Sequence, residues 1–76
     1  MTNKYAHAIK AIRQDRGFSQ LYMAEKLNMS RPSYISIEQG KHELTISEFE
    51  KLAEVLGVSF EELGSGESPN SKNISK

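Results

Sequence analysis

The feature that most constrains the fold is a three-residue link, Asn28-Met29-Ser30, between two short runs of periodic apolar residues. Apolar residues recur every three or four positions in both runs, a spacing that places them on one face of a helix. The first run follows Ser19 and the second follows Ser30, and serine is a favoured residue at the N-cap of a helix. Because the link leaves little room between two helices, the sequence predicts a tight helix-turn-helix over about residues 20–39.

The helical spacing continues on both sides of this pair. It predicts three further helices, over about residues 4–16, 45–56 and 59–63. Gly17 and Gly57 follow two of these helices, where a residue in the left-handed conformation commonly ends a helix. The segments Thr-Ile-Ser-Glu from Thr45 and Ser-Phe-Glu-Glu from Ser59 have the form of capping boxes, which begin helices.

The whole chain is 76 residues long, which allows one domain. Residues 64–76 are poor in apolar side chains and rich in Ser, Asn and Gly. We therefore predict an all-α fold, with a compact five-helix domain over residues 1–63 and a disordered tail over residues 64–76. No apolar run approaches the ~20 residues of a membrane span, so we expect no membrane contact and a cytoplasmic location.

Residue types that carry catalysis or bind metals are sparse. The chain has no cysteine, and its two histidines, His7 and His42, are far apart and lack the spacing of metal ligands. We find no nucleophile beside a base, no paired carboxylates and no Gly-rich phosphate loop. The sequence therefore predicts neither an enzyme nor a protein that needs a metal or cofactor.

Charge is unevenly distributed, although the formal net charge is zero. Residues 1–41 carry seven Lys and Arg against three acids, whereas residues 42–63 carry one against six. A basic half that contains a helix-turn-helix is compatible with binding to nucleic acid. Ordinary solvated helix faces would give the same pattern, so charge alone does not decide the function.

Residues 9–63 resemble the Cro/cI-type (XRE) family of helix-turn-helix DNA-binding domains. The matching features are Arg13, the pair Ser19-Gln20, Ala24, Ser30, the pair Ile37-Glu38, Gly40 and the closing segment Lys-Leu-Ala-Glu-Val-Leu-Gly-Val-Ser-Phe-Glu-Glu-Leu. The resemblance implies a lambda-repressor-like fold. It also implies a transcriptional regulator, a repressor that binds a palindromic operator in double-stranded DNA as a homodimer. The alternative is an antitoxin-like module that neutralises a protein partner and regulates its own promoter, because small members of the family are often antitoxins.

The resemblance also implies which residues meet DNA. They are Gln20, Ser30, Arg31, Pro32, Ser33, Ser36, Gln39 and Lys41. In this pattern Gln20 clamps a phosphate, and Lys41 contacts the backbone after the recognition helix. Arg31 matches a base-reading position, where a bidentate contact to guanine is worth ~1–3 kcal/mol of discrimination. A phosphate contact by Arg31 is the equal alternative. The pair Arg13 and Glu38 matches an internal ion pair of the family, with a structural role.

Several apolar residues are candidates for contact with a second protein. Leu21 and Tyr22 stand where the family usually has acidic or polar residues. They either form a contact surface for a second protomer or another protein, or pack beneath the tail or the first helix. A dimer interface is expected on the last helix and the loops before it. Its candidate residues are Leu44, Val58, Phe60 and Leu63.

Overall fold

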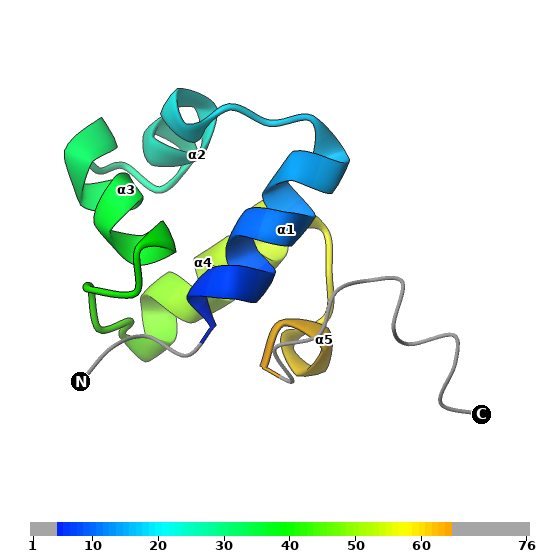
Figure 1. The fold of residues 1–76 in the computed structure, drawn as a ribbon. Helices are drawn as coiled ribbons and strands as arrows, with labels where there is room; N and C mark the ends of the chain where they lie inside the picture. Colours follow the sequence, from blue (N-terminus) through cyan, green and yellow to red (C-terminus); the bar gives the residue numbers. More distant parts are fainter. Residues whose placement is uncertain (1–4, 65–76) are drawn as a thin grey trace.

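Five helices make up the computed structural model, which describes residues 5–64 (Figure 1). They are α1 (Ala6–Arg16), α2 (Gln20–Lys26), α3 (Arg31–Glu38), α4 (Ile46–Leu56) and α5 (Phe60–Gly64). The described residues contain no strand, which confirms the predicted all-α class. The tail predicted over residues 64–76 lies, beyond Gly64, outside the described residues. The first helix was predicted from Lys4, which also lies outside them, and α1 is described from Ala6.

Polar side chains cap the N-termini of four helices, as the sequence predicts. The hydroxyls of Ser19, Ser30, Thr45 and Ser59 each accept a hydrogen bond from a backbone N–H three residues further on. At α4 the capping box is complete, because the Glu48 carboxylate accepts a hydrogen bond from the backbone N–H of Thr45 at 3.0 Å. These caps satisfy N–H groups that have no partner inside the helix, so the boundaries are fixed locally.

Residues in the left-handed conformation turn the chain between helices. Gly17 and Gly57 follow α1 and α4 with φ of 76° and 72°. Asn28, in the link between α2 and α3, has φ of 61° and is the one non-glycine residue with positive φ among the described residues. Asparagine tolerates this conformation better than most residues, so the link turns sharply without a glycine. Met29 then packs, partly buried, against the core.

All five helices contribute to a single hydrophobic core. Its buried members are Ile9, Ile12, Met23, Ala24, Tyr34, Ile37, Leu52, Ala53, Leu56 and Leu63. Leu63 has no exposed surface, because its side chain closes the core from α5. Leu63 was expected at a dimer surface, but in this structure it is enclosed within the monomer and offers no surface to a partner.

The helices are arranged so that the helix-turn-helix occupies one side of the molecule. Figure 1 shows α2 and α3 together on that side, α1 and α4 beside them, and α5 on the opposite side. The outer faces of α2 and α3 are thus left uncovered by the rest of the described chain. Between residues 5 and 64 no helix has the length and apolar character that crossing a membrane requires.

Candidate nucleic-acid interface

The N-terminal turn of α3 projects away from the core. Tyr34 and Ile37 hold this helix to the domain with fully buried side chains, whereas Arg31 and Pro32 are exposed. Pro32 lies in the first turn, where its missing N–H would have had no partner within the helix. Arg31 forms no hydrogen bond or ion pair with any residue between 5 and 64. Its charge is therefore available to a ligand in front of α3.

The hydroxyls of the N-cap serine and of the serines within α3 already take part in hydrogen bonds inside this segment. The Ser30 hydroxyl donates to the Ser33 hydroxyl at 3.0 Å, and the Ser36 hydroxyl donates to the carbonyl oxygen of Pro32 at 3.3 Å. Each of these oxygens can still accept a further hydrogen bond. The serines are thus weak discriminators, and Arg31 is the strongest candidate for reading a base.

A buried carboxylate, that of Glu38, joins three elements behind this surface. Arg13 of α1 donates to it from Nε at 2.5 Å and from Nη2 at 3.2 Å. The predicted ion pair between α1 and α3 is therefore present. Gln20 donates to the same carboxylate from Nε2 at 3.2 Å, and the Tyr34 hydroxyl donates to it as well. The Glu38 side chain is only 3% exposed, so these donors replace its hydration.

The cluster perturbs the ionisation of its members. The hydrogen bond to Glu38 raises the pKa of Arg13, although burial acts in the opposite direction. Burial raises the pKa of Tyr34 well above its usual range, and the hydrogen bond to Glu38 adds to the effect. Both shifts favour a charged Arg13 beside the carboxylate and a neutral Tyr34 hydroxyl that donates to it. Among residues 5–64, no buried side-chain nitrogen or oxygen lacks a hydrogen-bond partner.

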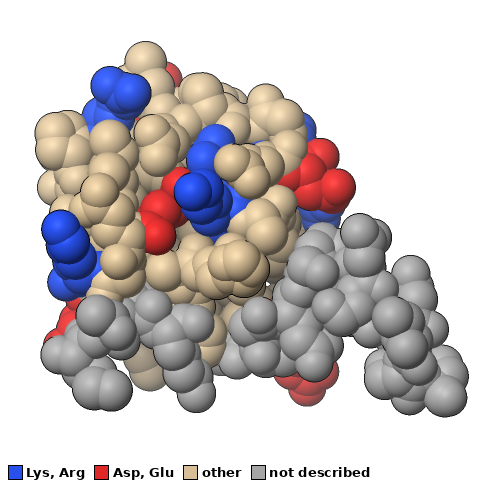
Figure 2. Space-filling model, in the orientation of Figure 1, with Lys and Arg blue, Asp and Glu red and all other residues tan. Residues whose placement is uncertain are grey.

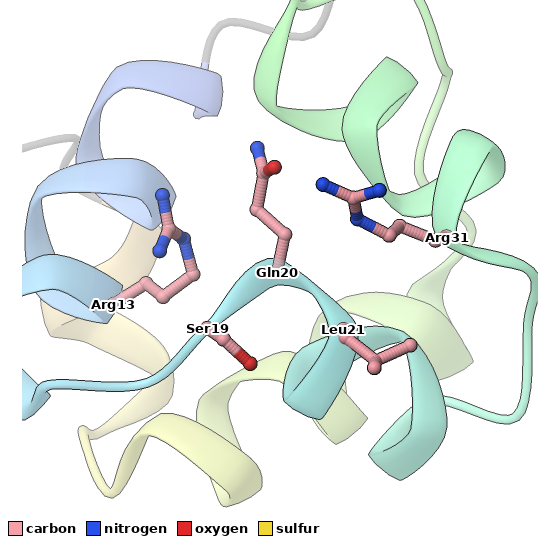
Figure 3. A pocket seen from close by; sticks show the side chains of 5 residues that line it. All are labelled: Arg13, Ser19, Gln20, Leu21 and Arg31. Atoms are coloured by element: carbon pink, nitrogen blue, oxygen red, sulfur yellow. The ribbon is translucent and has the colours of Figure 1, made fainter.

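A hollow of about 590 Å³ opens between the N-termini of α2 and α3. Its lining residues are Arg13, Ser19, Gln20, Leu21 and Arg31. Figure 3 shows Gln20 between the two arginines, with the guanidinium of Arg31 directed toward the Gln20 amide. Because Arg13 is already neutralised by Glu38, Arg31 supplies the net positive charge. The hollow suits an anionic group that accepts hydrogen bonds, such as a phosphate.

The other predicted backbone contacts lie at the far end of α3. Gln39 and Lys41 are both exposed there, and the backbone N–H of Lys41 bonds to the carbonyl oxygen of Ser36 at 3.0 Å. This bond fixes the start of the loop after α3. The predicted phosphate contacts therefore come from two places, Gln20 at the start of α2 and Lys41 after the end of α3. On the face drawn in Figure 2, Lys and Arg side chains occur at separate places, with neutral and some acidic side chains between them.

The residues singled out for protein contact have different environments. Leu21 is 52% exposed and Tyr22 is 37% exposed. The Tyr22 ring packs on Phe18 with centroids 4.5 Å apart, and Lys26 Nζ lies 5.5 Å from its centroid. Tyr22 is thus partly engaged within the domain through Phe18, whereas Leu21 is exposed at the edge of the hollow.

The expected dimer contacts are less open than the sequence suggests. Leu44 and Val58 are half-buried against the core, and the side chain of Phe60 lies outside the description of the structure. Ile46, which the sequence analysis did not single out, is 72% exposed in the first turn of α4. Its spacing matches the apolar stripe through Phe49, so no sequence signal marks it as exposed. The stripe extends into the first turn of α4, which the core does not cover.

Two contacts of the Glu38 cluster were also missed. The hydrogen bond from Gln20 joins residues far apart in sequence, and nothing in the pattern marks it. Tyr34 and Glu38, by contrast, are four residues apart in one helix, a spacing that brings side chains together and could have indicated their contact. Among the described residues no group of three or more His, Cys, Asp or Glu side chains could hold a metal ion.

Comparison with known proteins agrees with this geometry. The Helix-turn-helix family model matches residues 9–63. The immunity repressor protein of Bacillus phage phi105 is 40% identical over 50 residues, which are 66% of this chain and 35% of that protein. The SPbeta prophage-derived uncharacterized HTH-type transcriptional regulator YonR of Bacillus subtilis (strain 168) is 36% identical over 62 residues, which are 82% of this chain and 57% of that protein. The chain therefore spans about a third and somewhat over half of these two relatives.

Solved structures with the same fold include two restriction-modification controller proteins. C.Esp1396I is 34% identical with a TM-score of 0.71, and the match covers 84% of this chain and 90% of that one. C.AhdI from Aeromonas hydrophila is 25% identical with a TM-score of 0.73, and the match covers 79% and 91%. The matches extend over nearly the whole of both controller proteins. This chain therefore has the same fold as these two proteins over nearly their full length.

Proposed function

The chain belongs to the XRE-type helix-turn-helix family, and from this premise we propose that it is a sequence-specific DNA-binding transcriptional regulator. The observation that carries the proposal is the open N-terminal turn of α3, where Arg31 projects beside the Gln20 amide and has no partner among the described residues. In this family of folds the second helix of the motif enters the major groove while the first crosses the backbone. The family is one of DNA-binding regulators, so we propose no enzymatic activity.

Phosphate contacts fix the position of the domain on the duplex. Gln20 at the start of α2 and Lys41 after α3 can hold the backbone at two separate places. Gln39, exposed at the end of α3, adds a neutral donor. Such contacts orient the protein but carry no sequence information.

Base recognition falls to the first turns of α3. Arg31 can donate two hydrogen bonds to guanine, and the ring of Pro32 offers an apolar surface for a thymine methyl group. Ser36 is half-buried and already donates to Pro32, so it adds little discrimination. The small number of base-reading groups predicts modest specificity, supplemented by the shape of the DNA.

We further propose that the protein acts as a repressor and binds a palindromic site as a homodimer. A single domain of this size makes few base contacts, and two-fold pairing doubles them. The immunity repressor from phage phi105 supports repression by its name. For the interface, a hollow of about 260 Å³ at the start of α4 is lined mainly by apolar residues and includes the exposed Ile46. Two copies that buried this apolar surface would gain hydrophobic free energy.

The experiment that tests the proposal is selection of bound duplexes from a random pool at physiological salt, with the wild type and Arg31→Ala side by side. A palindromic consensus that loses preference at one base pair per half-site in the variant is the expected result. A uniform loss of affinity with an unchanged consensus would reassign Arg31 to a phosphate. No enrichment by the folded wild type over random DNA would contradict the proposal.

A protein-binding function, like that of an antitoxin, is favoured by one observation, the 52% exposure of Leu21. Leucine on an open helix face is typical of a contact residue when it is part of a larger patch. The same selection distinguishes the two functions, because Leu21→Ser should leave the consensus and affinity nearly unchanged if Leu21 serves only a protein partner. A loss of DNA affinity in that variant would place Leu21 in the DNA interface.

A further inference from the structure

We infer that Glu38 and the Tyr34 hydroxyl are positioning residues for DNA binding, because together they fix the orientation of the Gln20 amide toward the phosphate. The buried cluster that joins α1 to α3 would then also set the backbone contact of α2. This inference rests on the proposed function, and its test is chosen so that the two can fail separately.

The orientation of the Gln20 amide follows from which atom meets Glu38. The amide nitrogen lies 3.2 Å from Glu38 Oε1 and carries two hydrogens. One hydrogen bonds to Glu38, so the second remains for an oxygen of a phosphate in the hollow. If the amide were reversed, its oxygen would face the carboxylate, and both groups could only accept. Glu38 therefore excludes the reversed amide.

Glu38 can select this orientation because its own carboxylate is fixed. Each of its oxygens receives two donors, Oε2 from Arg13 Nε and Tyr34 and Oε1 from Arg13 Nη2 and Gln20. The two-pronged contact with Arg13 holds the plane of the carboxylate. Arg13 in turn donates from Nη1 to the carbonyl oxygen of Phe18 at 2.8 Å, one residue before the N-cap of α2. The cluster thus holds the backbone just before α2, through Phe18, and the side chain of the first residue of α2, Gln20.

Tyr34 is the member whose role can be separated from packing. Its ring belongs to the core, but its hydroxyl reaches Glu38, four residues further along α3. Tyr34→Phe keeps the ring and removes one of the two donors to Oε2, while Arg13 Nε still donates there. The carboxylate is then held at Oε2 by Arg13 alone and can shift together with the guanidinium relative to α2. We expect this shift to loosen the hold on Gln20 without unfolding the core.

The test is a double-mutant cycle on the selected duplex and on random DNA, with the wild type, Tyr34→Phe, Gln20→Ala and the double variant. Gln20→Ala should weaken binding to both DNAs by roughly three- to tenfold, the value of one hydrogen bond. Tyr34→Phe should weaken binding by part of this factor in the wild type, with an unchanged consensus, and by nothing in the Gln20→Ala background. Tyr22→Phe, a change at an exposed tyrosine of α2, is the matched control and should bind like the wild type.

Two outcomes would overturn the inference. One is wild-type affinity in Tyr34→Phe, and the other is an equal loss in both backgrounds, which would reflect stability alone.

A second readout does not depend on DNA. The two side-chain amide hydrogens of Gln20 should have separate, well-dispersed NMR resonances, and Tyr34→Phe should draw them together. If the wild type bound no DNA, the proposed function would fail, and unchanged resonances in Tyr34→Phe would still overturn the positioning role.

Discussion

The guanidinium of Arg13 and the carboxylate of Glu38 are 25 residues apart in sequence, and Arg13 Nε lies 2.5 Å from Glu38 Oε2. Their side chains are 10% and 3% exposed, so the pair is largely removed from water. In such a site the cost of dehydrating two charges can equal their attraction, and the pair contributes little net stability. Removal of one partner is different, because it leaves the other charge buried without compensation.

The first prediction follows from this asymmetry. Arg13→Met should lower the free energy of unfolding by roughly 3–5 kcal/mol, because the Glu38 carboxylate loses its counter-charge. The double variant Arg13→Met with Glu38→Leu should recover most of that loss, since neither charge remains. Urea unfolding followed by circular dichroism measures both values. If the double variant were as unstable as the single one, packing around Arg13 rather than its charge would account for the loss.

The boundaries of the helices could be predicted from sequence because their determinants are local. Ser19, Ser30 and Thr45 cap the helices that follow them, and each needs only the backbone a few residues ahead. Asn28 supplies the left-handed residue of the link in the same way. The contact between Arg13 and Glu38 is not local, and it was expected only because the sequence resembles a family in which those positions pair.

The features that sequence could not supply depend on how the helices are placed relative to one another. Leu63 and Ile46 have the same apolar character, yet one is fully buried and the other is 72% exposed. Their exposure is decided by where α5 folds back and where α4 extends past the core. The bond from Gln20 to Glu38 likewise requires α2 and α3 to meet at one angle. Periodicity identifies the inner face of a helix but does not show how far the core extends along it.

The second prediction concerns the pH dependence of stability through Glu48. Burial acts to raise the pKa of Glu48, but hydrogen bonds from the Thr45 backbone N–H and from His42 outweigh it, so the pKa lies below the ordinary 4.5. The stability that the charge supplies is therefore fully present above about pH 4.5 and is lost as the pH falls through the lowered pKa. Glu48→Gln should cost about 0.3–1 kcal/mol at neutral pH, the value of a charge near a helix N-terminus.

Thermal unfolding of the wild type and Glu48→Gln between pH 6 and pH 3 tests this prediction. The difference in unfolding free energy should be constant at the upper end of the range and should shrink below pH 4.5. A difference that persisted unchanged at pH 3 would show that the hydrogen bonds of the Glu48 side chain, rather than its charge, supply the stability.

The third prediction concerns the exposed apolar surface at the start of α4. If two copies pair there, Ile46→Glu should place like charges opposite each other and shift the protein toward monomer in analytical ultracentrifugation. Its thermal stability as a monomer should change little, because Ile46 is 72% exposed. Ile46→Val is the matched control and should dimerise like the wild type. A dimer that tolerated Ile46→Glu would place the interface elsewhere.

The last prediction separates the two kinds of DNA contact with a pair of cationic residues. Lys41→Ala should weaken binding to every sequence alike and reduce the slope of log affinity against log salt concentration by about 1, because one phosphate contact is lost. Arg31→Ala should instead relax preference at a single base pair of each half-site, at a cost of ~1–3 kcal/mol for the preferred base. Both residues are exposed, so neither change should alter the fold, which circular dichroism can verify. The salt slope is the deciding measurement: if Arg31→Ala lowered it as Lys41→Ala does and left the base preference intact, both residues would be phosphate contacts and sequence would be read through the shape of the DNA.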